Sequence, residues 1–330
     1  MNAESRGMRG GGDREDEALG PRISIEFHFS AHGTAEDLAH LVEMIHQADV
    51  YVPEAQGWSP KDKLELEAIS RGELTPVQAG FKGKRLPEME ALYNSKKPIL
   101  LIDTPKGHHT EKRYEESRTV ADRAVNLFET GKFEQALLQA KRYAEARHYL
   151  LNQRDDHLRV QLQYQLQNLT GNFPQLREKP EIKVLVFLGA AHQAVYEMME
   201  RAGKYGVTAE FAGEQVFPTY IEIVRMRKEG EKKIPDIMYA KAVLEDFLSP
   251  FFRIIGVTDT NDVFRLSHHC LRDLTMVEAK GISLVLANAG REQYRALWTE
   301  FARLGKSLPL SKAEADEILK KYQDVSEEKQ

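Results

Sequence analysis

The hydrophobic pattern of the chain is clearest at residues 183–192 (KVLVFLGAAH). Residues 184–189 are uncharged, rich in β-branched and aromatic side chains, and end at a glycine, as a strand buried on both faces does. From Ala194 onward, apolar residues recur at helical spacing. A strand, turn and helix in this order place the turn at the carboxyl end of a sheet strand, where open α/β sheets bind their ligands. The functional side chain in this turn is His192.

The beginning of the predicted ordered region has a second unit of the same kind. Residues 22–29 (RISIEFHF) have a strand pattern, and Thr34 begins a helix with a capping-box pattern. A short strand then ends at Glu54. In such a βαβ unit the two strands are parallel, so their carboxyl ends meet at one edge of the sheet. We therefore expect His32 and Glu54 at the same edge, and His192 beside them if its strand belongs to this sheet.

The rest of the pattern alternates between strands and long helical stretches. Residues 97–103 predict a third strand, and residues 206–211 and 282–287 predict two more. The pattern from about 110 to 170 is almost wholly helical. Further helices are predicted at residues 234–252, 263–274, 290–304 and 311–323. We expect an α/β fold with a mostly parallel central sheet, helices on both faces and a large helical insertion at about 110–170.

Length and composition set the domain organisation and exclude several classes. A chain of 330 residues is long enough for one large α/β domain. We expect it at 21–308, after a disordered segment at 1–20 and before a carboxyl-terminal helix and tail at 309–330. The net charge of −5 gives no electrostatic case for binding nucleic acid or an anionic membrane. No apolar run approaches the ~20 residues of a membrane span.

The single cysteine, Cys270, provides neither a disulfide framework nor a thiolate zinc site. It falls on the apolar side of its predicted helix, so we expect it in the core. The simplest interpretation of these features is a cytoplasmic protein. The sequence leaves a homo-oligomer open.

The residues expected at the sheet edge define the candidate chemistry. Two imidazoles and a carboxylate, from His32, His192 and Glu54, can bind a divalent metal ion and leave positions open for water. Without a metal, one histidine can act as the base that activates water while the glutamate orients it. Both possibilities remain open at this point.

Several other residues have a functional and a structural interpretation. His28 points to the opposite side of its strand from Phe27 and Phe29, and it is either a further ligand or structural. Asp103 is either a strand-end ligand or a helix cap. His108, in a polar loop after a predicted strand, either faces the same edge or is solvated. The residues at 225–228, mostly basic, are balanced by nearby glutamates and are expected to be solvated.

Some of these segments resemble a superfamily that joins the TraB/PrgY and TIKI proteins, the ChaN-like proteins and the erythromycin esterases. Its members carry two Gly-x-x-His turns, and a glutamate ends the strand after the first turn. Residues 48–54 (ADVYVPE) look like the glutamate strand, and residues 184–192 match the second turn with its glycine and histidine in place. Residues 29–32 (FSAH) correspond to the first turn, with Phe29 where the glycine stands.

Two more phrases extend the resemblance. Arg154, in the phrase QRD, is similar to the family's arginine at the start of a helix before the second turn. Residues 97–103 (KPILLID) resemble a strand of the ChaN-like members. The resemblance spans residues 23–206 as short phrases in the same order, and it stops at Val207.

The resemblance implies a site built from His32, Glu54, Arg154 and His192 at the carboxyl edge of the sheet. In the family such sites are proposed to hydrolyse peptide or ester bonds, with a divalent metal ion in TIKI-like members, whereas ChaN-like members are linked to haem binding. We therefore expect a hydrolase acting on a small-molecule or peptide substrate, either with Mn, Co or Zn or with water activated by histidine. The alternative is a non-catalytic protein that binds a metal, haem or a small ligand.

Overall fold

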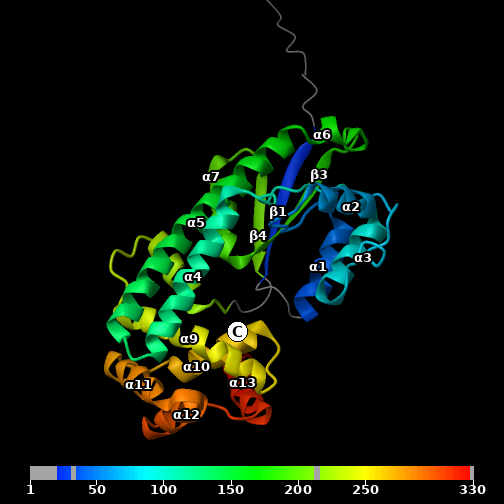
Figure 1. The fold of residues 1–330 in the computed structure, drawn as a ribbon. Helices are drawn as coiled ribbons and strands as arrows, with labels where there is room; N and C mark the ends of the chain where they lie inside the picture. Colours follow the sequence, from blue (N-terminus) through cyan, green and yellow to red (C-terminus); the bar gives the residue numbers. More distant parts are fainter. Residues whose placement is uncertain (1–20, 31–34, 212–215, 328–330) are drawn as a thin grey trace, which may run out of the picture.

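The computed structural model describes residues 21–30, 35–211 and 216–327 of the chain. The expected disordered segment at 1–20 lies outside these ranges, as does His32. Figure 1 shows the two parts of the molecule, a sheet with its covering helices and a group of helices beyond the carboxyl edge of the sheet.

The sheet confirms the predicted α/β class. Four parallel strands lie in the order β2-β3-β1-β4. Their bounds are Arg22–Ser30 for β1, Val50–Val52 for β2, Glu181–Gly189 for β3 and Gly206–Phe211 for β4. Ser30 lies beside Gly189 and His28 beside Glu210 in the strand register, so the turns after β1 and β3 begin at the same edge.

Two predicted strands are not strands in the structure. Residues 97–103 run beside β2 but form a single bridge, between Ile99 and Tyr51, because Pro98 and Pro53 have no N–H to donate on either side of it. Residues 282–287 lie inside helix α11 (Met276–Ala289). A capping box between Thr275 and Glu278 starts this helix. A short apolar run has no periodicity that distinguishes a strand from a buried helix. Here the capping box, which starts a helix six residues upstream of the run, accounts for the helical conformation.

Each face of the sheet is covered by its own helices (Figure 1). Helices α1 (Ala35–Gln47), α2 (Pro60–Ser70) and α3 (Leu86–Ser95) bury apolar side chains against one face. The second half of α5 (Phe133–Gln167) and α7 (Gln193–Ala202) pack against the other face. Expected helices on both faces are therefore present.

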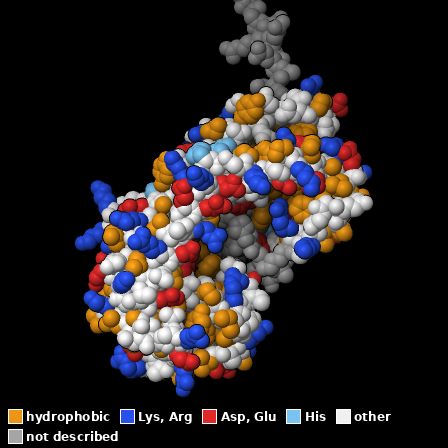
Figure 2. Space-filling view, in the orientation of Figure 1, with side chains coloured by type: hydrophobic (Ala, Val, Ile, Leu, Met, Phe, Trp, Pro, Cys, Tyr) orange, Lys and Arg blue, Asp and Glu red, His pale blue; other side chains and the backbone are white. Residues whose placement is uncertain are grey.

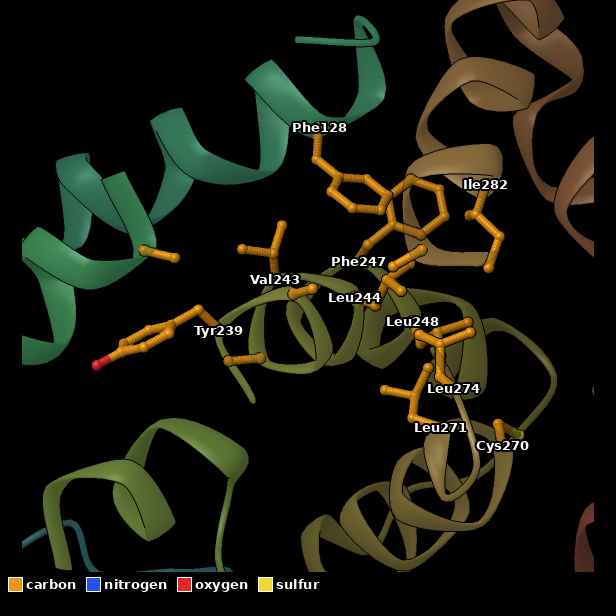
Figure 3. Close-up of a cluster of buried hydrophobic side chains, with 14 of the residues drawn as sticks. Phe128, Tyr239, Val243, Leu244, Phe247, Leu248, Cys270, Leu271, Leu274 and Ile282 are labelled. Atoms are coloured by element: carbon orange, nitrogen blue, oxygen red, sulfur yellow. The ribbon is translucent and has the colours of Figure 1, made fainter. Parts of the chain in front are cut away.

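The expected helical insertion is also present, and it leads into a second core. Helices α4 (His109–Glu129), α5 and the short α6 (Leu169–Asn172) occupy the predicted range. The first half of α5, together with α4, packs on the carboxyl-terminal helices around a separate cluster of buried side chains, drawn in Figure 3. Cys270 lies in this cluster at 3% exposure, as predicted, and burial raises the pKa of its thiol to about 12. After β4, the described residues contain helices and no further strand.

The remaining elements follow in chain order. The carboxyl-terminal helices are α8 (Thr219–Lys228), α9 (Asp236–Ile254), α10 (Thr260–Leu271), α11, α12 (Gln293–Arg303) and α13 (Lys312–Glu327). Short 3₁₀ turns lie at Gly83–Arg85, Pro174–Leu176, Ala190–His192 and Gly290–Glu292.

Candidate functional site

A cavity of about 390 Å³ lies where the carboxyl edge of the sheet meets the helices. It is lined by the end of β3 and its turn, by α4 and α5, and by residues of α8 and α10. In Figure 2 the surface is hollowed between the α1–α3 layer and the carboxyl-terminal helices, with Lys and Arg side chains at its margin. A volume of this size is in the range of pockets for small ligands.

Arg154 lines this cavity and pairs with two carboxylates, Glu54 in the cavity wall and Asp103 behind it. Its Nη2 lies 2.7 Å from Glu54 Oε1 and 2.6 Å from Asp103 Oδ2, and its Nε donates to Asp103 Oδ1 at 3.0 Å. Burial by itself lowers the pKa of Arg154. The two carboxylates raise it by a larger amount, so the net shift of the pKa is upward. The guanidinium therefore remains charged between two carboxylates, and in the described part of the chain Nη1 makes no hydrogen bond.

Backbone N–H groups fix both carboxylates. Glu54 lies just after β2, and its Oε2 accepts from the N–H of Gly189 at 2.5 Å, which links the end of β2 to the end of β3. Asp103 Oδ1 accepts from the N–H of Thr104 at 2.7 Å, and the Asp103 side chain is fully buried. Charge-assisted bonds of this kind are short and directional, so both carboxylates are held in place before any ligand arrives.

His192 forms a second charged group with residues from two helices. Its Nδ1 lies 2.5 Å from Asp155 Oδ1, and Asp155 Oδ2 accepts from Lys228 Nζ at 2.6 Å. His192 is 3% and Asp155 1% exposed. Because a carboxylate only accepts hydrogen bonds, Nδ1 carries the proton and Nε2 of a neutral ring carries the lone pair. That Nε2 lies 3.7 Å from Glu54 Oε1 and His192 lines the cavity.

The structure brings together three of the four residues expected at this site, Glu54, Arg154 and His192. The fourth, His32, lies outside the described residues. Asp103, expected as a strand-end ligand or a helix cap, is instead the partner of Arg154. His108 is the N-cap of α4, where its side chain accepts from the N–H of Thr110, and it does not line the cavity.

Asp155 and Lys228 were not identified as site residues from the sequence. Asp155 directly follows Arg154 in the phrase QRD, and the resemblance assigned a role only to the arginine. Lys228 belongs to the run expected to be solvated, but its side chain is only 20% exposed because it pairs with Asp155. Since α8 packs on α5, only tertiary structure brings this lysine to the site.

The described residues do not complete a metal site in this cavity. Glu54 Oε1 and His192 Nε2 are two donors, whereas a catalytic zinc ion uses three protein ligands. Asp103 and Asp155 already pair with Arg154 and Lys228, and a guanidinium also lies against Glu54. A different group could hold a metal ion, namely His28, His40 and Glu210 on the face of the sheet that α1 covers. His28 therefore lies away from the position expected for a further ligand.

Neither a scan against protein-family models nor searches of curated proteins and of solved structures found a match for this chain. Within the described ranges, no helix is both long and apolar enough to cross a membrane.

Proposed function

We propose that the protein is a hydrolase of peptide or ester bonds, in which His192 activates water in the cavity. The observation that supports this most strongly is the Asp155–His192 pair, because a buried carboxylate fixes the proton on Nδ1 and leaves Nε2 as a base. In this proposal Asp155, and not Glu54, is the carboxylate that orients the histidine.

The 3.7 Å between His192 Nε2 and Glu54 Oε1 suits one shared water molecule, which can lie about 2.8 Å from each atom. The water oxygen attacks the carbonyl carbon of the substrate while its proton passes to His192 Nε2. Glu54 orients the water and stabilises the imidazolium that forms. The same proton then passes to the leaving alcohol or amine as the bond to the carbonyl carbon breaks, and the other product is the acid.

Arg154 is the residue suited to stabilise the negative charge that develops on the carbonyl oxygen. It lines the cavity, and Asp103 fixes its orientation through two hydrogen bonds. A fixed cation in a partly buried site stabilises a developing oxyanion without reorganising. Its Nη1 is the group available for this contact.

The proposal is tested with panels of chromogenic esters and quenched peptides, and with His192→Ala beside His46→Ala, an exposed histidine of α1. We expect His192→Ala to lower kcat by about 10² to 10⁴, whereas His46→Ala has the rate of the wild type. Thermal unfolding of both variants checks that the fold persists. Equal rates for His192→Ala and wild type would exclude the proposed base.

A second candidate is a binding protein that holds a small ligand or haem in the same cavity. The observation in its favour is that each carboxylate of the site already has a cationic partner, which is typical of a rigid binding site as well as of a catalytic one. A chromophore that co-purifies with the wild type, together with no turnover of any substrate, would favour this candidate. Turnover that depends on His192 would exclude it.

A further inference from the structure

Two histidines and a glutamate meet on the α1 side of the sheet. His28 comes from β1, His40 from α1 and Glu210 from β4, and one ligand atom of each lies within 4.8 Å of the others. The strand register places His28 directly beside Glu210. The rings of His28 and His40 are 5.4 Å apart between centroids. The consecutive elements β1 and α1 and the distant strand β4 thus bring three donor atoms close together.

His28 is the most informative of the three because it is fully buried. Its Nε2 lies 3.1 Å from Asp37 Oδ1, while its Nδ1 is buried and has no hydrogen-bond partner. A buried polar atom without a partner is unfavourable by about 1–3 kcal/mol, so such atoms are rare in folded proteins. A metal-bound histidine has this arrangement, since one nitrogen binds the ion and the other donates to a carboxylate. Asp37 would then be the orienting carboxylate.

His40 and Glu210 are close without forming a hydrogen bond. His40 Nε2 lies 3.2 Å from Glu210 Oε1, yet the nitrogen is buried and its hydrogen-bonding geometry is unsatisfied. Two ligands of one tetrahedral zinc ion are separated by about 3.4 Å, and their lone pairs point to the ion instead of to each other. The observed pair matches this separation.

An ion pair between protonated His40 and Glu210 is the simpler explanation of their contact. Both side chains are substantially exposed, at 42% and 49%, and such pairs contribute little. This explanation leaves the buried Nδ1 of His28 without a partner. One bound cation accounts for all three side chains.

We propose that His28 Nδ1, His40 Nε2 and the Glu210 carboxylate bind one divalent transition-metal ion, with Asp37 orienting His28. Two imidazoles and one carboxylate favour Zn²⁺ and its neighbours over Ca²⁺ and Mg²⁺, which prefer oxygen ligands. Three protein ligands leave a position for water or an exchangeable ligand. The site connects α1 to the edge strand β4 and is separate from the cavity proposed for hydrolysis.

The test is calorimetric titration of the metal-stripped full chain with Zn²⁺. We expect one ion per wild-type chain, loss of binding in His40→Ala and Glu210→Gln, and affinity weakened about 10- to 100-fold in Asp37→Asn. The matched controls are His46→Ala, on the same helix, and Glu181→Gln, exposed at the opposite end of the sheet. Both should bind zinc as the wild type does.

The substitutions His40→Ala and Glu210→Gln both change exposed side chains, so the fold should persist. Circular dichroism checks this. His192→Ala separates this site from the cavity, because it should retain zinc binding whether or not the protein is a hydrolase. Unchanged zinc affinity in folded His40→Ala and Glu210→Gln would overturn the proposal. Loss of zinc in His192→Ala alone would overturn it as well, by assigning the ion to the cavity.

Discussion

The cavity and the cluster on the α1 side use the same residue types with different results. At and behind the cavity wall, the carboxylates of Glu54, Asp103 and Asp155 each lie against Arg154 or Lys228. In the other cluster, His40 and Glu210 have no cation beside them in the described residues, and Nδ1 of His28 has no partner. Near the cavity, Arg154 and Lys228 therefore occupy the carboxylate oxygens that a metal ion would need as ligands. The chemistry of a histidine–carboxylate group is therefore decided by its neighbours as much as by its members.

The largest effect is expected for Asp155→Asn. The amide can accept from Nδ1 only weakly and can also donate to it, which favours the tautomer with the proton on Nε2. We expect a loss of about 10² to 10⁴ in kcat, while zinc binding at the other cluster is unchanged. Steady-state kinetics and zinc titration of the same preparation measure both. Loss of zinc binding together with loss of activity would contradict the claim that the cavity and the His28–His40–Glu210 cluster are separate sites.

Arg154→Met should have the next largest effect, on stability. It leaves Glu54 and the buried Asp103 without their cation, and breaking a buried ion pair from one side is destabilising by about 3–5 kcal/mol. Urea unfolding measures the difference, with Arg159→Met, a more exposed arginine of the same helix, as the control. Destabilisation no greater than that of the control would mean that Arg154 does not hold the carboxylates.

Glu210→Gln should have a much smaller effect on the metal-free protein, about 1 kcal/mol or less, because its contact with His40 is exposed. The same urea experiment compares it directly with Arg154→Met. If metal-free Glu210→Gln were as unstable as Arg154→Met, the α1 cluster would be a structural ion pair.

The smallest expected effect is a shift in thermal stability on metal removal. An ion that binds only the folded chain raises Tm with its concentration. Chelation should therefore lower the Tm of the wild type and leave that of His40→Ala unchanged. Differential scanning fluorimetry with and without added Zn²⁺ checks this. Equal shifts for both proteins would place the ion elsewhere.

Local pattern was sufficient for much of the fold, because β1 alternates between its two faces and β3 is an uncharged run that ends at a glycine. It failed at 282–287, where an apolar run on α11 is as compatible with a strand, and at 97–103, where Pro98 removes a donor. The order of the strands and the packing of α8 on α5 depend on contacts distant in sequence.

The same limit applies to the candidate sites. Glu54 and His192 could be assigned to one edge because parallel strands end together. Asp155 could not be assigned from the sequence, because helical neighbours point about 100° apart and its partners His192 and Lys228 are distant along the chain. His40 lies on a helix whose capping-box start the sequence indicated, and it reaches His28 through the packing of α1 on the sheet.

The most direct test of the account is ester or peptide hydrolysis by chelator-treated protein, compared between wild type, His40→Ala and His192→Ala. We predict that wild type and His40→Ala remain active without metal, whereas His192→Ala is inactive with or without added Zn²⁺. Activity that disappears on chelation and returns with Zn²⁺ in the wild type, or persists in His192→Ala, would contradict it.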